Sequence, residues 1–494
     1  MTIHTPDWVK HAVFYQIFPD RFARHPGLVE DYETMSPLNL EPWDAPPTPH
    51  GYKGGNLRGV TSRLDYLKDL GITAIYFTPI FQSACNHRYH TFDYFQVDPL
   101  LGGNEAFFEM LHAAHARGIR VVLDGVFNHT GRGFFQFHDI VENGFQSPWS
   151  NWFKVRQFPL NAYADDPKEH PPNYDCWWNL RALPTLNHDN PAVREYIMRV
   201  AEHWIRAGID GWRLDVPEMI TAKNFWQEFR QRIKTINPDA YIVGEVWVDA
   251  RSWLDGEQFD GVMNYLFTKA ALSFLGHEHL DRKVLHDNFK DLNLVDAATY
   301  ARTIENILAL YPKEILWTQL NLLNSHDTAR FLSTVGINIH IAKLGALLLF
   351  TFPGAPCIYY GDEIGLEGHA DPDCRRGFPE GKNWKLELLE TYKKLIALRH
   401  REPVLSTGHY KTLVAKDMLY VFARVCAHNP SDAIIVATNN SASSVEISVP
   451  LEHCLPIGKN FSIIYGDGAC DTERSSDCQM LRLKIPPFGG VCAK

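Results

Sequence analysis

The sequence has 494 residues and a formal net charge of −10, from 48 Lys plus Arg and 58 Asp plus Glu. At about 150 residues per domain this length predicts about three domains, and an acidic chain without a basic run argues against a nucleic-acid partner. An apolar content of 45% and a charged content of 21% exclude a disordered or collagen-like chain. The aromatic content of 13%, with 13 Trp, needs an explanation.

Nothing in the sequence predicts export or membrane insertion. The N-terminus lacks the basic and apolar regions of a signal peptide, so we expect a cytoplasmic protein. The apolar stretch 344–360 is broken by Pro353 and Pro356, which favours a buried helix followed by a strand over a membrane span. Nine Cys without a CxxC pair predict reduced thiols, although five of them lie beyond residue 425 and leave one C-terminal disulfide open.

One pattern recurs along the chain: an amphipathic segment, a glycine and a short apolar run. The glycines are Gly71, Gly118 and Gly208. A glycine there fits the left-handed residue that ends a helix, and a run that is apolar on both faces fits a parallel strand covered by helices. With similar runs elsewhere, the sequence predicts eight strands, within 12–18, 72–77, 119–123, 209–214, 240–244, 259–265, 317–323 and 355–360.

Polar residues follow several of these strands directly. Asp124, Asp215 and Glu245 end the third, fourth and fifth strands, and His326 and Asp327 follow the seventh. A (β/α)8 barrel places the C-terminal strand ends around one active site. An open doubly wound sheet would instead carry a Gly-rich turn after a strand, whereas the glycine cluster at 51–59 follows a Pro-rich loop. The predicted fold is therefore an α/β (β/α)8 TIM barrel.

Two stretches do not fit the barrel pattern. Residues 129–187 are rich in Phe and Trp and too long for a simple loop, so they are interpreted as a small inserted domain, domain B, after the third strand. Beyond residue 405, short alternating runs predict a C-terminal antiparallel β-sandwich. The expected units are a catalytic barrel of residues 1–128 and 188–405, the insertion 129–187, and a β domain 406–494.

The carboxylates at the strand ends indicate which kind of reaction the site performs. Arg213 and Asp215 are two residues apart on one strand and point the same way, so the guanidinium should lower the pKa of Asp215 and keep it ionised as a nucleophile. Glu245, near other carboxylates, should have a raised pKa and act as an acid. This pair fits retaining glycoside hydrolysis. A magnesium site is the rival interpretation, and Arg213 argues against it because it would compete with the metal.

Four segments resemble the signature segments of the α-amylase superfamily, in the same order. They are DGVFNH (Asp124–His129), GWRLD (Gly211–Asp215), GEVW (Gly244–Trp247) and NSHD (Asn324–Asp327). The flanking segments VFYQIFPDRF, GITAIYFTP and YYGDEIGL are similar too, so the resemblance covers practically the whole chain. It implies that Asp215 is the nucleophile, Glu245 the general acid/base and Asp327 the transition-state stabiliser.

The resemblance also implies substrate-binding residues. Arg213 would orient Asp215, and Tyr89 would be a stacking platform for the sugar whose bond is cut. The other expected sugar contacts are Asp124, His129, His326, His87, Asp371 and Arg375. No metal site is predicted: His87 and His90 are interpreted as a sugar contact and a loop histidine rather than a metal pair. No cofactor is expected to be required, and calcium binding through Asn128 is left open.

The segment LPTLN (Leu183–Asn187) is closest to the cyclomaltodextrinase, maltogenic amylase and neopullulanase group. That resemblance implies cyclomaltodextrins, pullulan and maltooligosaccharides as substrates, cut at α-1,4 bonds, with cleavage of α-1,6 bonds left open. An α-glucosidase, a glucan transferase and an inactive glucan-binding relative are the alternatives. The group's extra N-terminal β domain is not expected here, so the sequence does not decide between a monomer and a homodimer. Glu218, Met219 and Val248 differ from residues common in the group.

Overall fold

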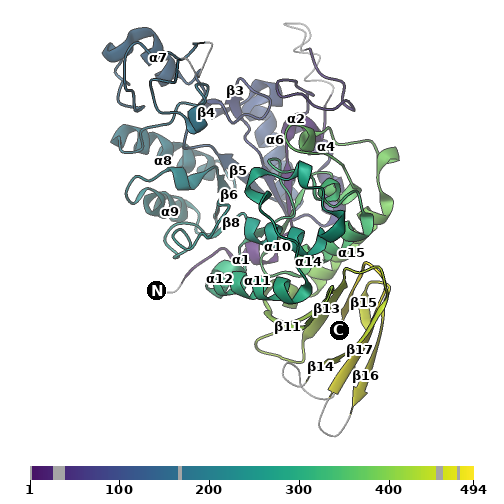
Figure 1. The fold of residues 1–494 in the computed structure, drawn as a ribbon. Coiled ribbons are helices and arrows are strands. Elements are labelled where there is room, and N and C mark those ends of the chain that lie inside the picture. The colour runs from purple at the N-terminus through teal and green to yellow at the C-terminus, as the bar shows by residue number, and fades with distance from the viewer. Residues whose placement is uncertain (1–2, 26–38, 165–169, 452–459, 475–478) are drawn as a thin grey trace.

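The structure is a computed structural model that describes residues 3–25, 39–164, 170–451, 460–474 and 479–494. Its centre is a sheet in which all neighbouring strands are parallel, in the order β8-β7-β6-β5-β2-β1-β10-β9 (Figure 1). A parallel bridge between Met263 and Leu320 joins the two ends, so the sheet closes into a barrel. The strands are β1 (Phe14–Ile17), β2 (Ala74–Phe77), β5 (Arg120–Gly125), β6 (Gly211–Leu214), β7 (Tyr241–Gly244), β8 (Gly261–Val262), β9 (Leu320–Asn321) and β10 (Ala355–Tyr359). The predicted (β/α)8 barrel and its eight strands are confirmed.

Glycines end the helices that precede barrel strands, as the sequence pattern predicts. Helix α5 (Leu64–Leu70) ends at Gly71, whose φ of 95° is left-handed, and Gly208, after α8 (Pro191–Arg206), has a φ of 108°. Only glycine adopts these angles without strain. A Cβ at Gly71 would also lie 2.6 Å from Cγ2 of Ile396. These turns let each helix pack back against the next strand.

The helices surround the barrel, and its strands are almost wholly buried. The apolar helix α14 (Ile339–Thr351) leads into β10, as expected for the stretch 344–360. No helix in the described part of the chain combines the length and apolarity that crossing a membrane requires. The other helices are α1 (Asp7–His11), α2 (Pro19–Phe22), α4 (Leu57–Ser62), α6 (Gly103–Ala116), α9 (Phe225–Ile236), α10 (Tyr265–Leu275), α11 (Ala297–Ala309), α12 (Lys313–Leu316), α13 (Phe331–Thr334), α15 (Leu386–Arg401) and α16 (Val404–Thr407).

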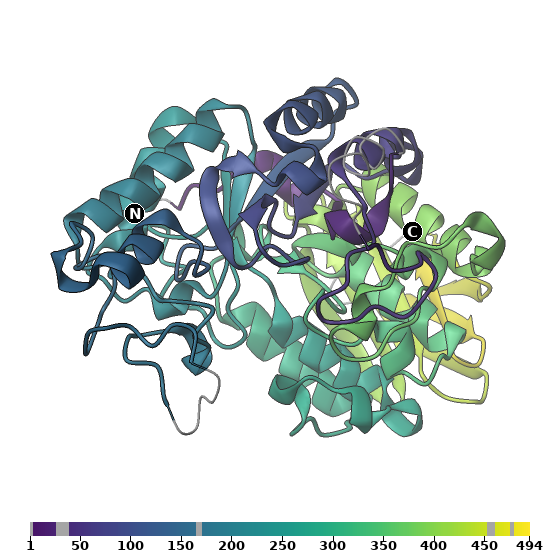
Figure 2. The same ribbon diagram turned by 90° about the horizontal axis from the view of Figure 1, so that it is seen from above.

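Where the structure describes the segment 129–187, its regular structure consists of α7 (Phe135–Asn143), two short 3-10 helices (Gly144–Gln146 and Trp177–Asn179) and isolated bridges such as His129 to Thr185. It lies on the opposite side of the barrel from the C-terminal strands in both views (Figures 1 and 2). Its rings pack on one another: Phe137 contacts Phe153 and Tyr174 at centroid distances of 5.0 and 5.1 Å. Part of the aromatic surplus therefore forms the core of this segment.

Two antiparallel sheets follow the last barrel helices. One has the order β11-β12-β13-β18-β15 and the other β14-β17-β16. Their facing side chains form a second apolar core, which includes Val421, Ile435 and Leu483. The strands are β11 (His409–Lys416), β12 (Leu419–Val425), β13 (Ala433–Asn439), β14 (Val445–Pro450), β15 (Ile463–Tyr465), β16 (Ala469–Arg474), β17 (Gln479–Ile485) and β18 (Gly489–Ala493). The predicted C-terminal antiparallel β unit is confirmed; the boundaries expected at residues 128, 187 and 405 remain predictions.

The cysteines bear on the C-terminal disulfide that the sequence leaves open. The cysteines in the described residues are free thiols, and among them are Cys426, Cys470 and Cys492. Cys454 and Cys478 lie outside the described residues. Reduced thiols are thus found wherever the structure describes a cysteine.

Candidate active site

One guanidinium joins three carboxylates at the C-terminal ends of neighbouring barrel strands. Arg213 Nη1 donates to Asp124 Oδ1 and Oδ2 at 3.0 and 3.1 Å and to Asp215 Oδ1 at 2.9 Å. Its Nη2 lies 3.0 Å from Glu245 Oε2. The parallel register of β5 and β6 pairs Asp124 with Arg213 directly. The structure thus brings four of the predicted site residues into one cluster.

The backbone fixes the two carboxylates proposed for catalysis. The amide of Glu245 donates to Leu214 O at 2.9 Å, and the amide of Asp215 donates to Gly125 O at 3.2 Å. Val216 adopts a left-handed φ of 35°, and its N–H donates to Glu245 Oε2 at 3.2 Å. A β-branched residue in this conformation is strained, and such strain is concentrated at functional sites. The strained turn after β6 therefore holds Glu245 beside Asp215.

Burial controls the protonation of this cluster. Loss of hydration raises the pKa of Asp124 to about 6, and Arg213 acts in the opposite direction. Burial also raises the pKa of Asp215 well above its ordinary value and raises that of Glu245. The expectation that Arg213 would hold the pKa of Asp215 low is wrong for the site without substrate. Arg213 does lower it, but burial contributes more, and Glu245 and Asp124 add to the increase. One cation among three carboxylates favours retention of a shared proton.

Tyr89 and His326 connect the cluster to β1. His326 Nδ1 lies 2.8 Å from the side-chain amide nitrogen of Gln16, so Nδ1 accepts and the ring proton sits on Nε2. Nε2 donates to the Tyr89 hydroxyl at 2.5 Å, and that hydroxyl donates to Asp124 Oδ2 at 2.9 Å. The rings of Tyr89 and His326 are parallel with centroids 5.5 Å apart. Burial lowers the pKa of His326 well below its usual range, so the ring is neutral.

Asp327 lies at the more open side of the site, with 27% of its side chain exposed. Its Oδ2 lies 3.3 Å from His326 Nε2, and its Oδ1 lies 3.4 Å from Arg375 Nη2. Arg375 also contacts Asp371 Oδ1 at 3.0 Å and donates to the backbone oxygen of His326 at 2.8 Å. The predicted residues Asp327, Arg375 and Asp371 therefore belong to the same contact network as the cluster.

His129 offers an unused donor. Its Nδ1 lies 3.3 Å from the side-chain nitrogen of Asn128, so the ring proton sits on Nε2. Nε2 is buried and forms no hydrogen bond within the described residues. Burial lowers the pKa of His129 to about 3, so the ring is neutral near pH 7. A buried donor without a partner is costly unless a ligand completes it, which supports a binding role for His129.

The contacts of Asn128 bear on the calcium binding that the sequence leaves open. Its Oδ1 is buried without a hydrogen-bond partner in the described residues, and this is the one observation that points to a cation there. Calcium takes about six to eight oxygen ligands. The amide nitrogen of Asn128 faces an imidazole nitrogen, so this side chain offers one free oxygen, and calcium binding there stays open. That no cofactor is required stays a prediction.

His87 lies next to Tyr89, with ring centroids 5.6 Å apart. Its Nδ1 accepts the Tyr89 backbone N–H at 3.3 Å. The structure therefore places this predicted sugar contact at the border of the network.

Two residues of the site, Gln16 and Trp247, have no role in the sequence interpretation, and a third, Glu218, is noted there only as a departure from the group. Gln16 sets the His326 tautomer. Trp247 donates from Nε1 to Glu245 Oε1 at 3.3 Å and stacks on Tyr265 with centroids 3.5 Å apart. Burial and the charge of Glu245 raise the pKa of Glu218 to about 7, and its Oε2 is buried without a partner in the described residues. Trp247 lies within the quoted motif GEVW and Gln16 within the quoted segment VFYQIFPDRF, so the sequence marked both positions without assigning them a role.

Comparison with known proteins gives the family. Residues 16–385 match the family model of the alpha amylase catalytic domain. A cyclomaltodextrinase of Geobacillus thermopakistaniensis is 41% identical over 98% of this chain and 77% of its own length. The crystal structure of a debranching enzyme from Nostoc punctiforme is 52% identical, with a TM-score of 0.92 and full coverage of both chains. A cyclic alpha-maltosyl-(1→6)-maltose hydrolase from Arthrobacter globiformis, in complex with that sugar, is 35% identical with a TM-score of 0.84 over both full chains. The chain belongs to the α-amylase family of glycoside hydrolases.

Proposed function

We propose that this protein is a retaining α-glucan hydrolase in which Asp215 is the nucleophile, Glu245 the general acid/base and Asp327 the transition-state stabiliser. The observation that carries the proposal is the buried Arg213 guanidinium shared by Asp215 and Glu245. Retaining glycosidases need two carboxyls about 5 to 5.5 Å apart, one ionised and one protonated. A guanidinium that contacts both carboxyls keeps them close, and burial among other carboxylates holds a proton on one of them.

The reaction then has two steps. In the reactive state the shared proton lies on Glu245 and Asp215 is ionised. Asp215 attacks the anomeric carbon while the Glu245 proton passes to the departing glycosidic oxygen, so the glycosidic bond breaks as a glycosyl ester forms. Water next loses a proton to Glu245, attacks the same carbon and releases Asp215 as a carboxylate. As Asp215 gives up its charge to the ester, Arg213 remains paired with Asp124 and Glu245, so the guanidinium is never left alone in the barrel.

The surrounding residues present hydrogen-bonding groups to the sugar. His129 has a free Nε2–H, and the hydroxyl of Tyr89 and Nε2 of His326 form a fixed chain to Asp124. Because both imidazoles are neutral, they add donors without adding positive charge near Arg213. Asp327, the most exposed of the three proposed catalytic carboxylates, can accept sugar hydroxyls and favour a distorted ring.

We propose cyclomaltodextrins, pullulan and maltooligosaccharides as substrates. The segment LPTLN and the similarity to a cyclomaltodextrinase support this choice, and the similarity to the Nostoc debranching enzyme favours α-1,6 bonds as well as α-1,4 bonds. An α-glucosidase or a glucan transferase with the same machinery is the alternative. A cytoplasmic location and a monomeric or homodimeric state, without nucleic-acid or membrane partners, remain predictions.

Replacing Glu245 by Gln removes the proposed proton donor. We expect the rate on maltotriose to fall by about 10²- to 10⁴-fold, the usual contribution of general acid–base catalysis, with an unchanged circular dichroism spectrum. The loss in the first step should be smaller with maltosyl fluoride, whose leaving group needs little protonation. The neighbouring variant Glu218→Gln is the control. Near-normal hydrolysis of maltotriose by Glu245→Gln would refute the assignment.

Glu218 should affect the pH profile rather than the rate at the optimum. The alkaline limb of kcat/KM follows loss of the Glu245 proton, and negative charge on Glu218 raises the pKa of Glu245 because the interaction is reciprocal. Glu218→Gln removes that charge, so we expect the limb to move to lower pH. Glu142→Gln, exposed on α7, should leave it in place. If the alkaline limb of Glu218→Gln stays in place or moves to higher pH, the result would contradict the assignment of Glu245 as the acid.

A product digest distinguishes the proposed activity from its alternatives. We expect the enzyme to open β-cyclodextrin and to release panose from pullulan, because a site for internal bonds does not require a chain end. Thin-layer or ion-exchange chromatography of the products over time, with Asp215→Asn as the blank, checks this. Glucose alone from chain ends would indicate an α-glucosidase, and longer oligosaccharides from maltotriose as main products would indicate a glucan transferase.

A further inference from the structure

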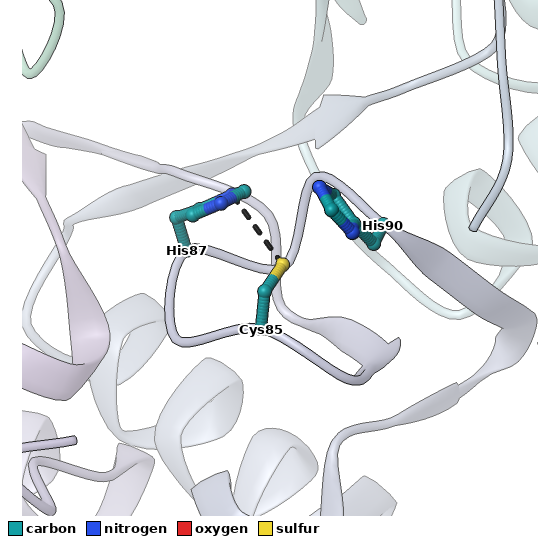
Figure 3. A group of neighbouring side chains, drawn as sticks. All are labelled: Cys85, His87 and His90. Atoms are coloured by element: carbon teal, nitrogen blue, oxygen red, sulfur yellow. Dashed lines mark hydrogen bonds between the residues drawn. The ribbon is translucent and has the colours of Figure 1, made fainter. Parts of the chain in front are cut away.

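Three potential metal ligands lie together in the loop between β3 (Phe81–Ser83) and β4 (Thr91–Val97). Figure 3 shows Cys85, His87 and His90 around one space, with the Cys85 thiol between the two imidazoles. Their donor atoms all lie within 4.8 Å of one another, and Cys85 Sγ is 3.5 Å from His87 Nδ1. Ligands of a tetrahedral zinc-type ion lie about 3.5 Å apart. The cluster therefore needs a closure of about 1 Å to hold such an ion.

The side chains have suitable chemistry. Burial lowers the pKa of His90 to about 4 and that of His87 well below its usual range, so both rings are neutral and have a lone pair to donate. Burial raises the pKa of the Cys85 thiol, so the ion must displace its proton to solvent, forming a metal–thiolate bond. A thiolate with two imidazoles suits zinc and other thiophilic ions and does not suit magnesium or calcium.

The loop backbone is anchored independently of these side chains. Arg88, with a left-handed φ of 60°, is buried and donates to Asp98 Oδ2 at 3.1 Å. The side-chain nitrogen of Asn86 donates to Gly51 O at 2.8 Å. With Asn86 and Arg88 fixed, the three ligands keep their places when free, and closure around an ion requires only side-chain rotation.

We propose that Cys85, His87 and His90 bind one zinc-type ion, with water in the fourth position, and that the bound ion inhibits the enzyme. The inhibitory effect rests on the proposed function, because it takes His87, which lies beside Tyr89, as the sugar contact that the family resemblance implies. Metal binding draws the His87 imidazole toward Cys85 and alters its hydrogen bond to the Tyr89 amide. The ion then competes with the sugar for His87.

The charges around the loop make the thiolate essential. The charged and titratable groups that face the three ligands are Arg88, Arg132, Arg375, His129, His326, Tyr52 and Tyr89. The guanidiniums oppose a dication, and the negative thiolate offsets that repulsion. A serine in place of Cys85 supplies no such charge at neutral pH, so Cys85→Ser should lose binding rather than weaken it slightly.

Binding is tested on the full chain without any activity measurement. We expect one Zn²⁺ per chain by competition with a chromophoric chelator, and a thiolate-to-metal charge-transfer band when Co²⁺ is used as the probe. Cys85→Ser and His90→Asn should each abolish both signals. Cys176→Ser, which removes another half-buried free thiol, should retain them. Absence of zinc binding to the wild type, or binding that survives both Cys85→Ser and His90→Asn, would overturn the site.

Inhibition is a separate readout. We expect Zn²⁺ to raise KM for maltotriose more than it lowers kcat, because it competes with sugar for His87, and a chelator should reverse the effect. Cys85→Ser and His90→Asn should keep basal activity and lose the sensitivity to zinc. Stoichiometric binding with unchanged KM would overturn the inhibitory link, and it would leave the proposed hydrolase function untouched, since that is judged by Glu245→Gln.

Discussion

A single buried cation, Arg213, is the constraint on which the site depends. Its guanidinium is fully buried and contacts Asp124, Asp215 and Glu245, which come from three adjacent strands. Removing one member of such a buried network leaves an uncompensated charge, which costs about 3 to 5 kcal/mol. The contacts therefore hold the ends of β5, β6 and β7 in one arrangement. That arrangement places the two proposed catalytic carboxylates beside each other before substrate arrives.

The excess of negative charge around Arg213 indicates that the cluster has a chemical role as well as a structural one. A purely structural ion pair would balance its charges, whereas three carboxylates share one guanidinium. Burial raises the pKa of all three carboxyls, so the cluster retains a proton that can be given to a leaving group. Because His129 and His326 are neutral, the net charge of the cluster stays negative. Within the described residues, Arg213 is the one cation in contact with these three carboxylates.

Much of the fold was predictable because the barrel leaves regular marks in the sequence. Gly71, Gly118 and Gly208 mark helix ends, and the eight apolar runs coincide with the eight strands. The residues at strand ends were predictable for the same reason, since parallel strands converge at one edge. The role of Gln16 was not, because its contact with His326 spans 310 positions of sequence. The net pKa of Asp215 was also missed, because burial cannot be weighed against a neighbouring charge from spacing alone.

The high aromatic content of residues 129–187 shows the same limit of prediction from sequence. The sequence located the rings in residues 129–187 but could not divide them between a core and a surface. Phe137, Phe153 and Tyr174 pack inside that segment, whereas Trp178 is 73% exposed and stacks on Trp177, which lies against His129. Both kinds of ring lie in the same segment, and the sequence does not show which are buried, so only their packing separates structural rings from those that sugars can reach.

The most direct measurement of the central claim is to trap the glycosyl ester. A 5-fluoro-α-glucosyl fluoride reacts readily with a retaining nucleophile but leaves slowly, so the ester accumulates. Mass spectrometry of the intact chain should show the added mass of one sugar, and peptide mapping should place it on Asp215. A label on Glu245 or another residue, or turnover without any label while the product appears as the inverted anomer, would contradict the account.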